Sequence, residues 1–542
     1  MKIAFIPPIS FFPEQYFNFV SVFDQYCDPN SIFLSTDSFT HLMFTILVHI
    51  ITSQREIYKD LFIDKQMQLD HTLTHNNALT YKSSGDCLVD FFFKITRDTP
   101  EDTIFQLLQK CWKDFPLETL KLVFHLRDTR GGKGEKKPYR SCLIWLETFY
   151  PVILVKNFDC IPEYGYYKDF YTLLDSSIEP YVINYLCDKL KDDLSKEANK
   201  RSLCSKWLPT EGSSIDKKYS LVRKLCKNLG MSKKEYRKTL VKLREDLNIV
   251  ETSMCNNHWD QIDYSKVSSL AFKRYKKSFQ KHSPELFNQF LERVKEGTSK
   301  INTSRLFPHD IINDCHRNEF DKTIELQWTE FLRSLNVKNL GNSLAVVDVS
   351  GSMNEKVGNT SAMMIAISLG MICAHFAQGP FKDKWITFSG TPMLESLKGD
   401  TLKERISNMV STHWEMNTNL QAVFELILNF ALAYNTPQES MPMTIFIFSD
   451  MQFDAALTNT RTNFDEIERL YQTYDYKRPR IVFWKIDSIN DDCPIKFDQN
   501  DTALLSGYSP ELLKMIIEGE EISPLNVVMK VINSERYNLV TL

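Results

Sequence analysis

The pattern of apolar residues changes once along this chain of 542 residues, near residue 343, and that change limits the folds open to it. Before this point, apolar residues recur at steps of three and four, as they do on amphipathic helices. After it, short apolar runs that fit buried strands alternate with helical segments, which is typical of a parallel sheet with crossover helices. The sequence therefore predicts a multidomain protein with an α-helical region followed by an α/β region.

Helical periodicity continues from about residue 86 to residue 300. Ile104, Leu107, Leu108 and Trp112 show the spacing, and breakers such as Phe115-Pro116 separate one helical segment from the next. Short amphipathic helices in succession predict stacked helical hairpins, so we expect a HEAT-like solenoid. There is no repeat of fixed period, so the repeats must be degenerate.

The α/β region is expected to be doubly wound (Rossmann-like) and covered on both faces. We expect strands at 343–348, 385–388, 443–450 and 480–486, and helices at 361–378, 402–410, 420–434 and 463–474. The boundary between the two regions falls within 297–342. The predicted domains are an N-terminal segment of unassigned role at 1–80, a helical-repeat domain at 81–335 and an α/β domain at 340–542.

Composition excludes several classes of protein. The 12 cysteines include no Cys-x-x-Cys pair, so we expect reduced thiols and no structural zinc. The longest apolar run, 39–51, is too short to cross a bilayer, which favours an intracellular, cytoplasmic protein without a membrane partner. His71 and His75 have helical i,i+4 spacing, but their polar neighbours favour a loop, so we expect no metal there.

The string Asp348-Val-Ser350-Gly-Ser352 directly follows the first predicted strand of the α/β region. Ligands of open α/β sheets bind at the carboxyl ends of the strands, near the point where the strand order reverses. A carboxylate and two hydroxyls on alternate residues suit a hard cation. Thr418, just before a predicted helix, and Asp450, at the end of a predicted strand, can reach the same edge of the sheet.

Asp348-x-Ser350-x-Ser352 with the later Thr418 and Asp450 resembles the metal-ion-dependent adhesion site (MIDAS) of von Willebrand factor A domains. The resemblance implies Mg²⁺, with Mn²⁺ as the alternative, and an open coordination position for an acidic group of a protein partner. It also implies that Ser350, Ser352 and Thr418 supply hydroxyls, while Asp348 and Asp450 bind mainly through water. Many such domains have Gly where this chain has Asn417.

Other chemistries fit these residues less well. Asp348 and the serines could cap the next helix. An aspartyl-phosphate enzyme would need a second carboxylate at the position of Ser350, and a serine hydrolase would need Gly-x-Ser-x-Gly. No general base lies beside these residues in the sequence, so we predict a binding site and a protein that is not an enzyme.

Arg127-Asp-Thr-Arg130-Gly-Gly-Lys133-Gly-Glu135 lacks the Gly-x4-Gly-Lys-Ser/Thr pattern of a phosphate-binding loop and lies between two predicted helices. We interpret it as a glycine-rich turn with exposed cations, which leaves phosphate contact open.

Charge is distributed unevenly along the chain. Residues 200–300 carry 23 Lys/Arg and 11 Asp/Glu, a balance of +12, whereas the whole chain has a net charge of −4. Aromatic residues such as Tyr236, Trp259 and Tyr275 lie among the basic ones. Basic groups with interleaved aromatics suit phosphate contact and base stacking, although a charge run is also typical of an ordinary solvated helix face.

A second resemblance covers most of the chain. Residues 127–135, Ile161-Pro-Glu-Tyr-Gly-Tyr-Tyr-Lys-Asp169, Lys206-Trp-Leu-Pro209 and Tyr236-Arg-Lys238 resemble the helical-repeat domain of Ro/TROVE proteins, which also end in a von Willebrand A domain. An uncharacterised family of eukaryotic and large-virus proteins with this layout is more similar still. The resemblance implies binding of structured or noncoding RNA. The predicted RNA-binding residues are Arg130, Lys133, Lys206, Arg237, Lys238, Arg244, Lys273, Arg274, Lys276 and Lys277.

The sequence thus predicts a non-enzymatic RNA- or ribonucleoprotein-binding protein with a Mg²⁺-dependent partner site. The alternatives are a protein–protein scaffold that binds no RNA and, third, a metal-dependent hydrolase.

Overall fold

The computed structural model describes residues 70–317, 321–337, 339–412, 417–455, 461–487, 491–517 and 522–542. Asp70–Leu542 form one compact unit, which is described below. The predictions for residues 1–69, including the apolar run at 39–51, lie outside the described residues. Within the part of the chain described, no helix is long and apolar enough to cross a membrane.

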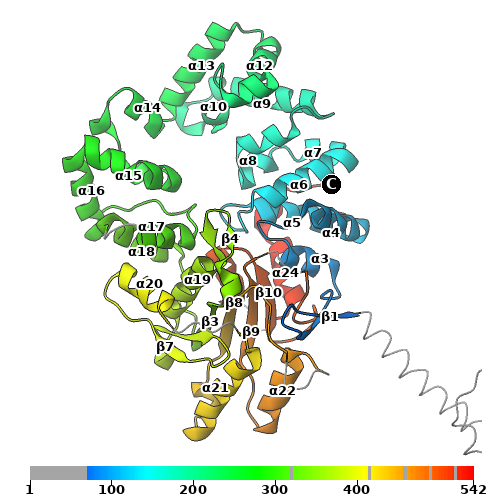
Figure 1. Ribbon diagram of the computed structural model, residues 1–542. Coiled ribbons are helices and arrows are strands. Elements are labelled where there is room, and N and C mark those ends of the chain that lie inside the picture. Colours follow the sequence, from blue (N-terminus) through cyan, green and yellow to red (C-terminus); the bar gives the residue numbers. More distant parts are fainter. Residues whose placement is uncertain are drawn as a thin grey trace, which may run out of the picture. The chain divides into compact units, whose positions relative to one another are not determined.

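The first part of this unit is helical, as predicted (Figure 1). Its α-helices are α3 Cys87–Lys94, α4 Glu101–Asp114, α5 Pro116–Arg127, α6 Lys137–Phe149, α7 Pro151–Lys156, α8 Cys160–Tyr164, α9 Glu179–Ser195, α10 Cys204–Trp207, α11 Ser214–Tyr219, α12 Leu221–Leu229, α13 Lys233–Asp246, α14 Val250–Cys255, α15 Ser269–His282, α16 Pro284–Lys295, α17 Pro308–Arg317 and α18 Lys322–Ser334. The 3₁₀ helix η2, Tyr167–Leu173, lies between α8 and α9.

Local sequence explains where these helices begin and which face they bury. Pro100 is the N-cap of α4, and Pro116 occupies the first turn of α5, where a missing N–H costs no hydrogen bond. The buried face of α4 consists of the apolar residues spaced at three and four, among them Ile104, Leu108 and Trp112. Most helices share one large core with the α/β region, whereas Tyr264, Phe272, Phe287 and their neighbours in and around α15 and α16 form a second, smaller core.

The C-terminal part contains a six-stranded mixed sheet in the order β10-β9-β8-β3-β6-β7. Its strands are β3 Ser343–Asp348, β6 Lys384–Phe388, β7 Leu394–Ser396, β8 Thr444–Ser449, β9 Arg480–Lys485 and β10 Thr502–Ser506. All neighbouring pairs are parallel except β6 and β7. The predicted parallel strands and their alternation with helices are therefore confirmed. The strand order is that of a doubly wound sheet, read from edge to edge as third, second, first, fourth, fifth and sixth strand.

Helices and strands of this region pack closely. Its α-helices are α19 Ala362–Phe376, α20 Leu402–Val410, α21 Leu420–Ala433, α22 Asn463–Thr473, α23 Leu513–Ile517 and α24 Pro524–Ile532. Every residue of β3 and β8 is buried, so both faces of the sheet centre are covered. Helix α19 contacts β3, β6 and β8, and a Cβ on Gly370 would lie 2.4 Å from Cγ2 of Val347, so only glycine allows this approach.

Both ends of the helical region pack against the α/β region. Helix α3 contacts β10 and α24, and α17 contacts α19 and α20 (Figure 1). The turn at 127–135 forms part of the first contact. The prediction of exposed cations is wrong for Arg127 and Lys133, which are buried, as are Asp128 and Glu135. Arg130, the third cation of the turn, is exposed and pairs with Glu163.

Lys133 joins the two regions through hydrogen bonds. Its Nζ donates to the carbonyl of Phe92, to the carbonyl of Ile95 at 3.0 Å and to Oγ of Ser506 in β10 at 2.7 Å. Burial lowers the pKa of Lys133 to about 7, an effect that the neighbouring Glu135 carboxylate opposes. Gly134 has a φ of +71°, and a Cβ there would lie 2.9 Å from Cζ of Phe307, so the turn also contacts the segment that precedes α17.

Asp128, in the same turn, holds the C-terminal residues. Its carboxylate accepts hydrogen bonds from the guanidinium of Arg536 and, at 3.0 Å, from the hydroxyl of Tyr537. Nδ1 of His125 lies 2.8 Å from the same hydroxyl. The end of the chain is therefore fixed to α5 by a fully buried carboxylate.

Lys133→Met should lower the free energy of unfolding by about 2–4 kcal/mol, because it leaves buried acceptors without a donor. The matched control is Lys137→Met, since Lys137 is 70% exposed and its pairing with Asp98 is at the surface. This control should change the free energy by less than about 1 kcal/mol. Urea denaturation at pH 7.5 measures both, and equal effects of the two substitutions would contradict the junction described for Lys133.

Candidate metal and partner site

The residues predicted to form a metal site lie where the strand order of the sheet reverses. Strands β3 and β8 are neighbours, yet the chain leaves them toward opposite edges of the sheet. Asp348 is the last residue of β3, and Asp450 directly follows β8. Because parallel strands present their carboxyl ends at one edge, both carboxylates lie in the crevice at which doubly wound sheets bind ligands.

Hydrogen bonds fix the first half of this site. Oδ1 of Asp348 accepts from the backbone N–H of Ser350 at 2.9 Å, and Oγ of Ser350 lies 3.0 Å from Oγ of Ser352. Oδ2 of Asp348 accepts from the hydroxyl of Ser449 at 2.6 Å. Helix α19 is capped by Ser361, so the capping role considered for Asp348 and the serines is not what these side chains do.

The loop after β8 carries the second half. Oδ1 of Asp450 accepts from the backbone N–H of Gln452 at 3.0 Å, and the carbonyl of Gln452 accepts from the hydroxyl of Thr418 at 2.5 Å. Met451, between them, has a φ of +69°, a left-handed conformation that is costly for a residue with a Cβ. The hydroxyl of Ser449 also lies 3.4 Å from Oδ1 of Asp450, so one network joins all five predicted site residues.

A strand-turn-strand segment that precedes the helical region lies against this loop. It consists of β1 His71–Leu73 and β2 Leu79–Tyr81, an antiparallel pair. Nδ2 of Asn76 donates to the carbonyl of Gln452 at 2.8 Å and to Oγ1 of Thr418 at 3.3 Å. Residues 70–80, placed by the sequence in a segment of unassigned role, thus contribute directly to the edge of the site.

Sequence reasoning missed Ser449, Gln452 and Asn76. Ser449 had a local signal, because it immediately precedes Asp450 at the end of a strand. Asn76 had none, because its partners are more than 300 residues away. The loop predicted around His71 and His75 is wrong at His71, which belongs to β1 and whose ring centroid lies 4.7 Å from that of Tyr81.

The electrostatics of the site suit a cation. Burial and then the Asp450 carboxylate raise the pKa of Asp348 to about 7, although hydrogen bonds from Ser449 and Ser350 oppose the change. Among the described residues, neither Asp348 nor Asp450 forms an ion pair with a lysine, arginine or histidine. Hydroxyl and carboxylate oxygens are the donors that Mg²⁺ and Mn²⁺ accept, so Asp348, Ser350, Ser352, Thr418 and Asp450 fit such an ion.

Access to the site is from one side. Asp348, Ser350, Thr418 and Asp450 are buried, whereas Ser352 is exposed on the 3₁₀ helix η6, Gly351–Asn354. Among the described residues, no group of three or more His, Cys, Asp and Glu side chains is placed to hold a metal, so two carboxylates supplemented by hydroxyls are what this site offers. An incoming group would meet Ser352 first.

The structure separates the predicted RNA-binding residues into three groups. Lys133 and Lys276 are buried, Lys276 beside Asp321, so neither is available to a phosphate and both predictions are corrected. Lys206, Arg244 and Lys273 are half-buried, and Lys273 pairs with Asp310 and Asp314. The exposed residues are Arg130, Arg237, Lys238, Arg274 and Lys277.

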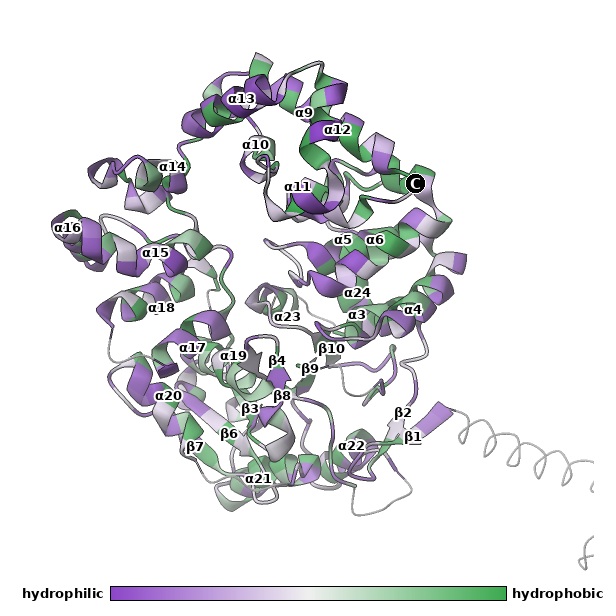
Figure 2. Cartoon of the chain, turned by 45° about the horizontal axis from the view of Figure 1, so that its top comes forward, coloured by the Kyte–Doolittle hydropathy of each residue, from purple (hydrophilic) through white to green (hydrophobic). Residues whose placement is uncertain are grey.

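Four of the exposed residues lie in α13 and α15. In the described part of the chain no acidic side chain pairs with Arg237 or Lys238 in α13, or with Arg274 or Lys277 in α15. In Figure 2 both helices contain many residues in the purple of hydrophilic residues.

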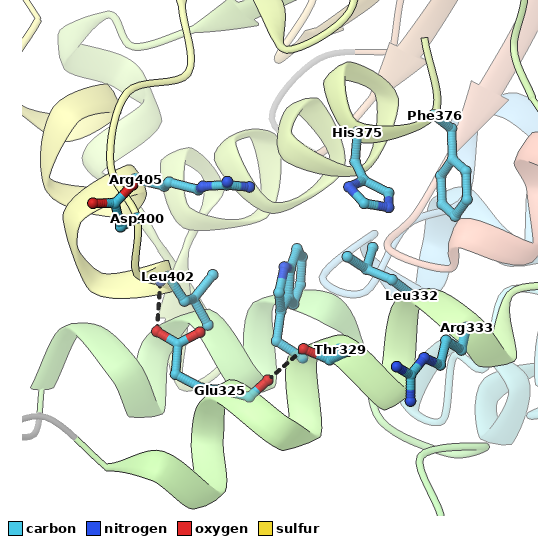
Figure 3. Close-up of a pocket in the computed structure, with 10 residues that line it drawn as sticks. Glu325, Thr329, Leu332, Arg333, His375, Phe376, Asp400, Leu402 and Arg405 are labelled. Atoms are coloured by element: carbon cyan, nitrogen blue, oxygen red, sulfur yellow. Dashed lines mark hydrogen bonds between the residues drawn. The ribbon is translucent and has the colours of Figure 1, made fainter. Parts of the chain in front are cut away.

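A separate cleft of about 420 Å³ lies between α18 and the α/β region (Figure 3). Leu332 of α18 faces His375 and Phe376 at the end of α19, and Trp328 of α18 also lines the cleft. The carboxylate of Glu325 accepts a hydrogen bond from the backbone N–H of Leu402 at 2.5 Å, so α18 satisfies a free N–H at the start of α20. The cleft contains none of the five predicted metal ligands.

In metal-free protein, Asp348→Asn should raise the free energy of unfolding at pH 8 by about 1–3 kcal/mol. Because the folded-state pKa of Asp348 is raised to about 7, protonation favours the folded state. This stabilisation is fully present below about pH 4 and is lost as the pH rises through 7. Asparagine mimics the protonated form, so the difference between variant and native protein should vanish near pH 4. Urea denaturation from pH 4 to 8 measures it, and a pH-independent difference would contradict the buried carboxylate pair.

Comparison with known proteins gives two family models that match in tandem. Residues 74–185 and 181–340 match DUF2828, and residues 342–538 match DUF7788, each described as a domain of unknown function. The junction between the matches coincides with the start of β3. The first match begins after β1 and includes Asn76 and β2, so this part of the strand-turn-strand segment and the helical region match the same family model.

Similar proteins have been found in a large virus and among solved structures. An uncharacterized protein of Acanthamoeba polyphaga mimivirus, L728, is 28% identical over 502 residues, which cover 85% of this chain and 87% of that protein. The crystal structure of the Deinococcus radiodurans Ro (RSR) protein aligns with a TM-score of 0.40 and 13% identity, over 83% of this chain and 99% of that one. The chain thus joins a region similar to DUF2828 to a region similar to DUF7788, and the large-virus relative aligns with most of its length.

Proposed function

We propose that the C-terminal region is a von Willebrand A domain whose adhesion site binds Mg²⁺, or Mn²⁺ in its place, and through it an acidic group of a partner. The observation that carries this proposal is the network that joins Asp348, Ser350, Ser352, Thr418 and Asp450 at the point where the strand order reverses. The two buried carboxylates have no cationic side chain beside them in the described residues, and a bound cation would remove that cost.

The residues have distinct roles in this proposal. Ser350, Ser352 and Thr418 would hold the ion through hydroxyls, and Asp348 and Asp450 would act mainly through water. The metal supplies a positive charge that a carboxylate of a partner can bind. Asn76 and Gln452 hold Thr418 in place, and the exposed position of Ser352 leaves the approach for that carboxylate.

We also propose that the helical region is a HEAT-like repeat that binds structured or noncoding RNA, and that the protein is not an enzyme. The supporting observation is the set of exposed cations without acidic partners in α13 and α15, within a stretch of +12. Such cations attract the phosphate backbone independently of base sequence. A protein scaffold that binds acidic proteins through the same surface is the alternative, and a metal-dependent hydrolase is a weaker one.

Mg²⁺ at about 5 mM should raise the melting temperature of the native protein, because a ligand that binds only the folded state stabilises it. Asp348→Asn should abolish this shift, whereas Asp498→Asn, at an exposed carboxylate, should retain it. The shift should be larger at pH 8 than at pH 5.5, because protons compete with the metal for the carboxylates. Differential scanning fluorimetry measures it, and a shift that persists in Asp348→Asn would refute the metal assignment.

Neutralising the exposed cations of α13 and α15 should weaken RNA binding at least tenfold at about 50 mM salt and reduce the slope of log K against log salt by about 3. The variant is Arg237→Gln, Lys238→Gln, Arg274→Gln and Lys277→Gln. Its control removes four exposed lysines elsewhere, by Lys110→Gln, Lys113→Gln, Lys477→Gln and Lys530→Gln, with the same change in net charge.

Filter binding with a structured RNA over a series of salt concentrations distinguishes the two variants. Absence of RNA binding by the native protein at low salt would refute the RNA proposal and favour the scaffold. Equal losses in both variants would show that net charge, and not the surface of α13 and α15, determines affinity.

A further inference from the structure

Two aromatic rings and three cations gather where distant segments of the helical region meet. The rings of Tyr166, the N-cap of η2, and Trp207, the last residue of α10, have centroids 5.6 Å apart. Nζ of Lys168 lies 4.9 Å, and Nζ of Lys206 5.6 Å, from the centroid of Trp207. The guanidinium of Arg305, which precedes α17, lies 5.3 Å from the centroid of Tyr166. We call these five residues the Tyr166–Trp207 cluster.

Further basic residues lie beside the cluster and add to its positive charge. Lys136 and Arg140, near the start of α6, lie beside it, and the pKa of Lys136 is lowered, first by burial and then by Arg140. The neighbouring carboxylate, Asp169, is buried and pairs with Arg127 at 2.8 Å and with Arg140 at 3.3 Å. In the described part of the chain, Lys168, Lys206 and Arg305 have no ion pair. Like charges held together in this way favour a polyanionic ligand.

The rings themselves are held rigidly. The backbone N–H of Tyr166 donates to Asp169 at 3.1 Å, and the guanidinium of Arg127 lies 4.8 Å from the Tyr166 ring centroid. The carbonyl of Trp207 accepts from the hydroxyl of Tyr171. Arg244 donates to the carbonyls on either side of Trp207, those of Ser205 at 2.9 Å and Leu208 at 2.8 Å, which is the role the structure gives to this predicted RNA-binding residue.

Tyr166, Trp207 and Lys206 are half-buried, whereas Lys168 is exposed. An exposed cation–π contact is weak, so a lysine that lies over a ring at the surface can leave the ring for another partner at a small cost in free energy. The face of Trp207 is therefore available to a flat ligand, and the two ammonium groups can turn to the anion that accompanies it.

We propose that the Tyr166–Trp207 cluster binds an unpaired nucleotide of single-stranded RNA, whose base stacks on Trp207 while Lys168, Lys206 and Arg305 contact the adjacent phosphates. This proposal rests on the RNA-binding function above and names the part of the RNA that is bound at a second surface. A base can stack only where it is not paired, so the cluster selects single strands over duplexes. An acidic protein segment would neutralise the cations but leave the rings without a partner.

The test uses the full chain and three probes: a labelled single-stranded oligouridine of about 12 nucleotides, a duplex of equal length, and inorganic polyphosphate. Trp207→Ala should weaken oligouridine binding about 5- to 100-fold and leave polyphosphate binding within about twofold, because only the RNA offers a base to stack. Lys168→Gln with Lys206→Gln and Arg305→Gln should weaken both and lower the single-strand salt slope by about 2.

Controls separate stacking from folding. Trp207→Phe keeps a flat ring and should restore most of the affinity. Trp259→Ala removes a tryptophan that stacks on His282 at 4.3 Å elsewhere in the helical region, and should leave oligouridine affinity unchanged. Thermal unfolding verifies that each variant is folded.

The outcomes distinguish this inference from the proposed function. If the native protein binds structured RNA but Trp207→Ala binds oligouridine as tightly as the native chain does, the cluster is not a nucleotide site and the RNA function stands. Equal affinity for single strand and duplex, or an equal loss of polyphosphate binding in Trp207→Ala, would also overturn the inference. If no RNA binds at low salt, the proposed function fails first.

Discussion

The rest of the structure depends on the buried charges of the turn at 127–135. Arg127, Asp128, Lys133 and Glu135 lie within nine residues and are nearly inaccessible to water. Burying a charge is unfavourable unless it has a partner, and each of these has one in a different part of the chain: Asp169, Arg536, Ser506 and Arg97 respectively. The contacts of Asp128 with Arg536 and of Lys133 with Ser506 join the helical region to the α/β region, whereas those of Arg127 with Asp169 and of Glu135 with Arg97 lie within the helical region.

The same turn also contacts segments that hold the Tyr166–Trp207 cluster and the sheet that carries the proposed metal site. Arg127 holds Asp169, which in turn accepts from the backbone of Tyr166, so the aromatic cluster is fixed by the same turn that fixes the domain junction. Lys133 holds β10 at one edge of the sheet, while α17 and α18 contact α19 and α20 toward the other. The first and the last helices of the helical region therefore pack against the α/β region, and Asn76 adds a contact with Thr418 of the proposed metal site.

Local sequence was sufficient for much of this architecture. The strands at 343–348 and 480–486 and the helices at 402–410 and 420–434 agree with β3, β9, α20 and α21 to within a residue or so, because each is a buried run or an amphipathic period with clear ends. Strand β7, with three residues at an edge, and β10 have too short a pattern to stand out. Four of the five predicted metal-site residues lie at or just after the end of a strand. Because the carboxyl ends of neighbouring parallel strands lie close together, the topology of the sheet brings these residues into one network.

The sequence could not predict the environment of a charged residue whose partners are distant in the sequence. Lys133 and Arg237 have equally polar neighbours in sequence, yet the first is buried against carbonyls and the second lies exposed on α13. Only contacts with residues distant in the sequence distinguish these two side chains, and those contacts determine what each charge does. Where a buried or crowded charge has an internal partner, as in the turn at 127–135, it serves the fold. The described residues supply no such partner to Asp348 with Asp450 or to Lys168 with Lys206 and Arg305. For these two sets of charges we propose a counter-charge from outside the chain, a cation in the first case and a polyanion in the second.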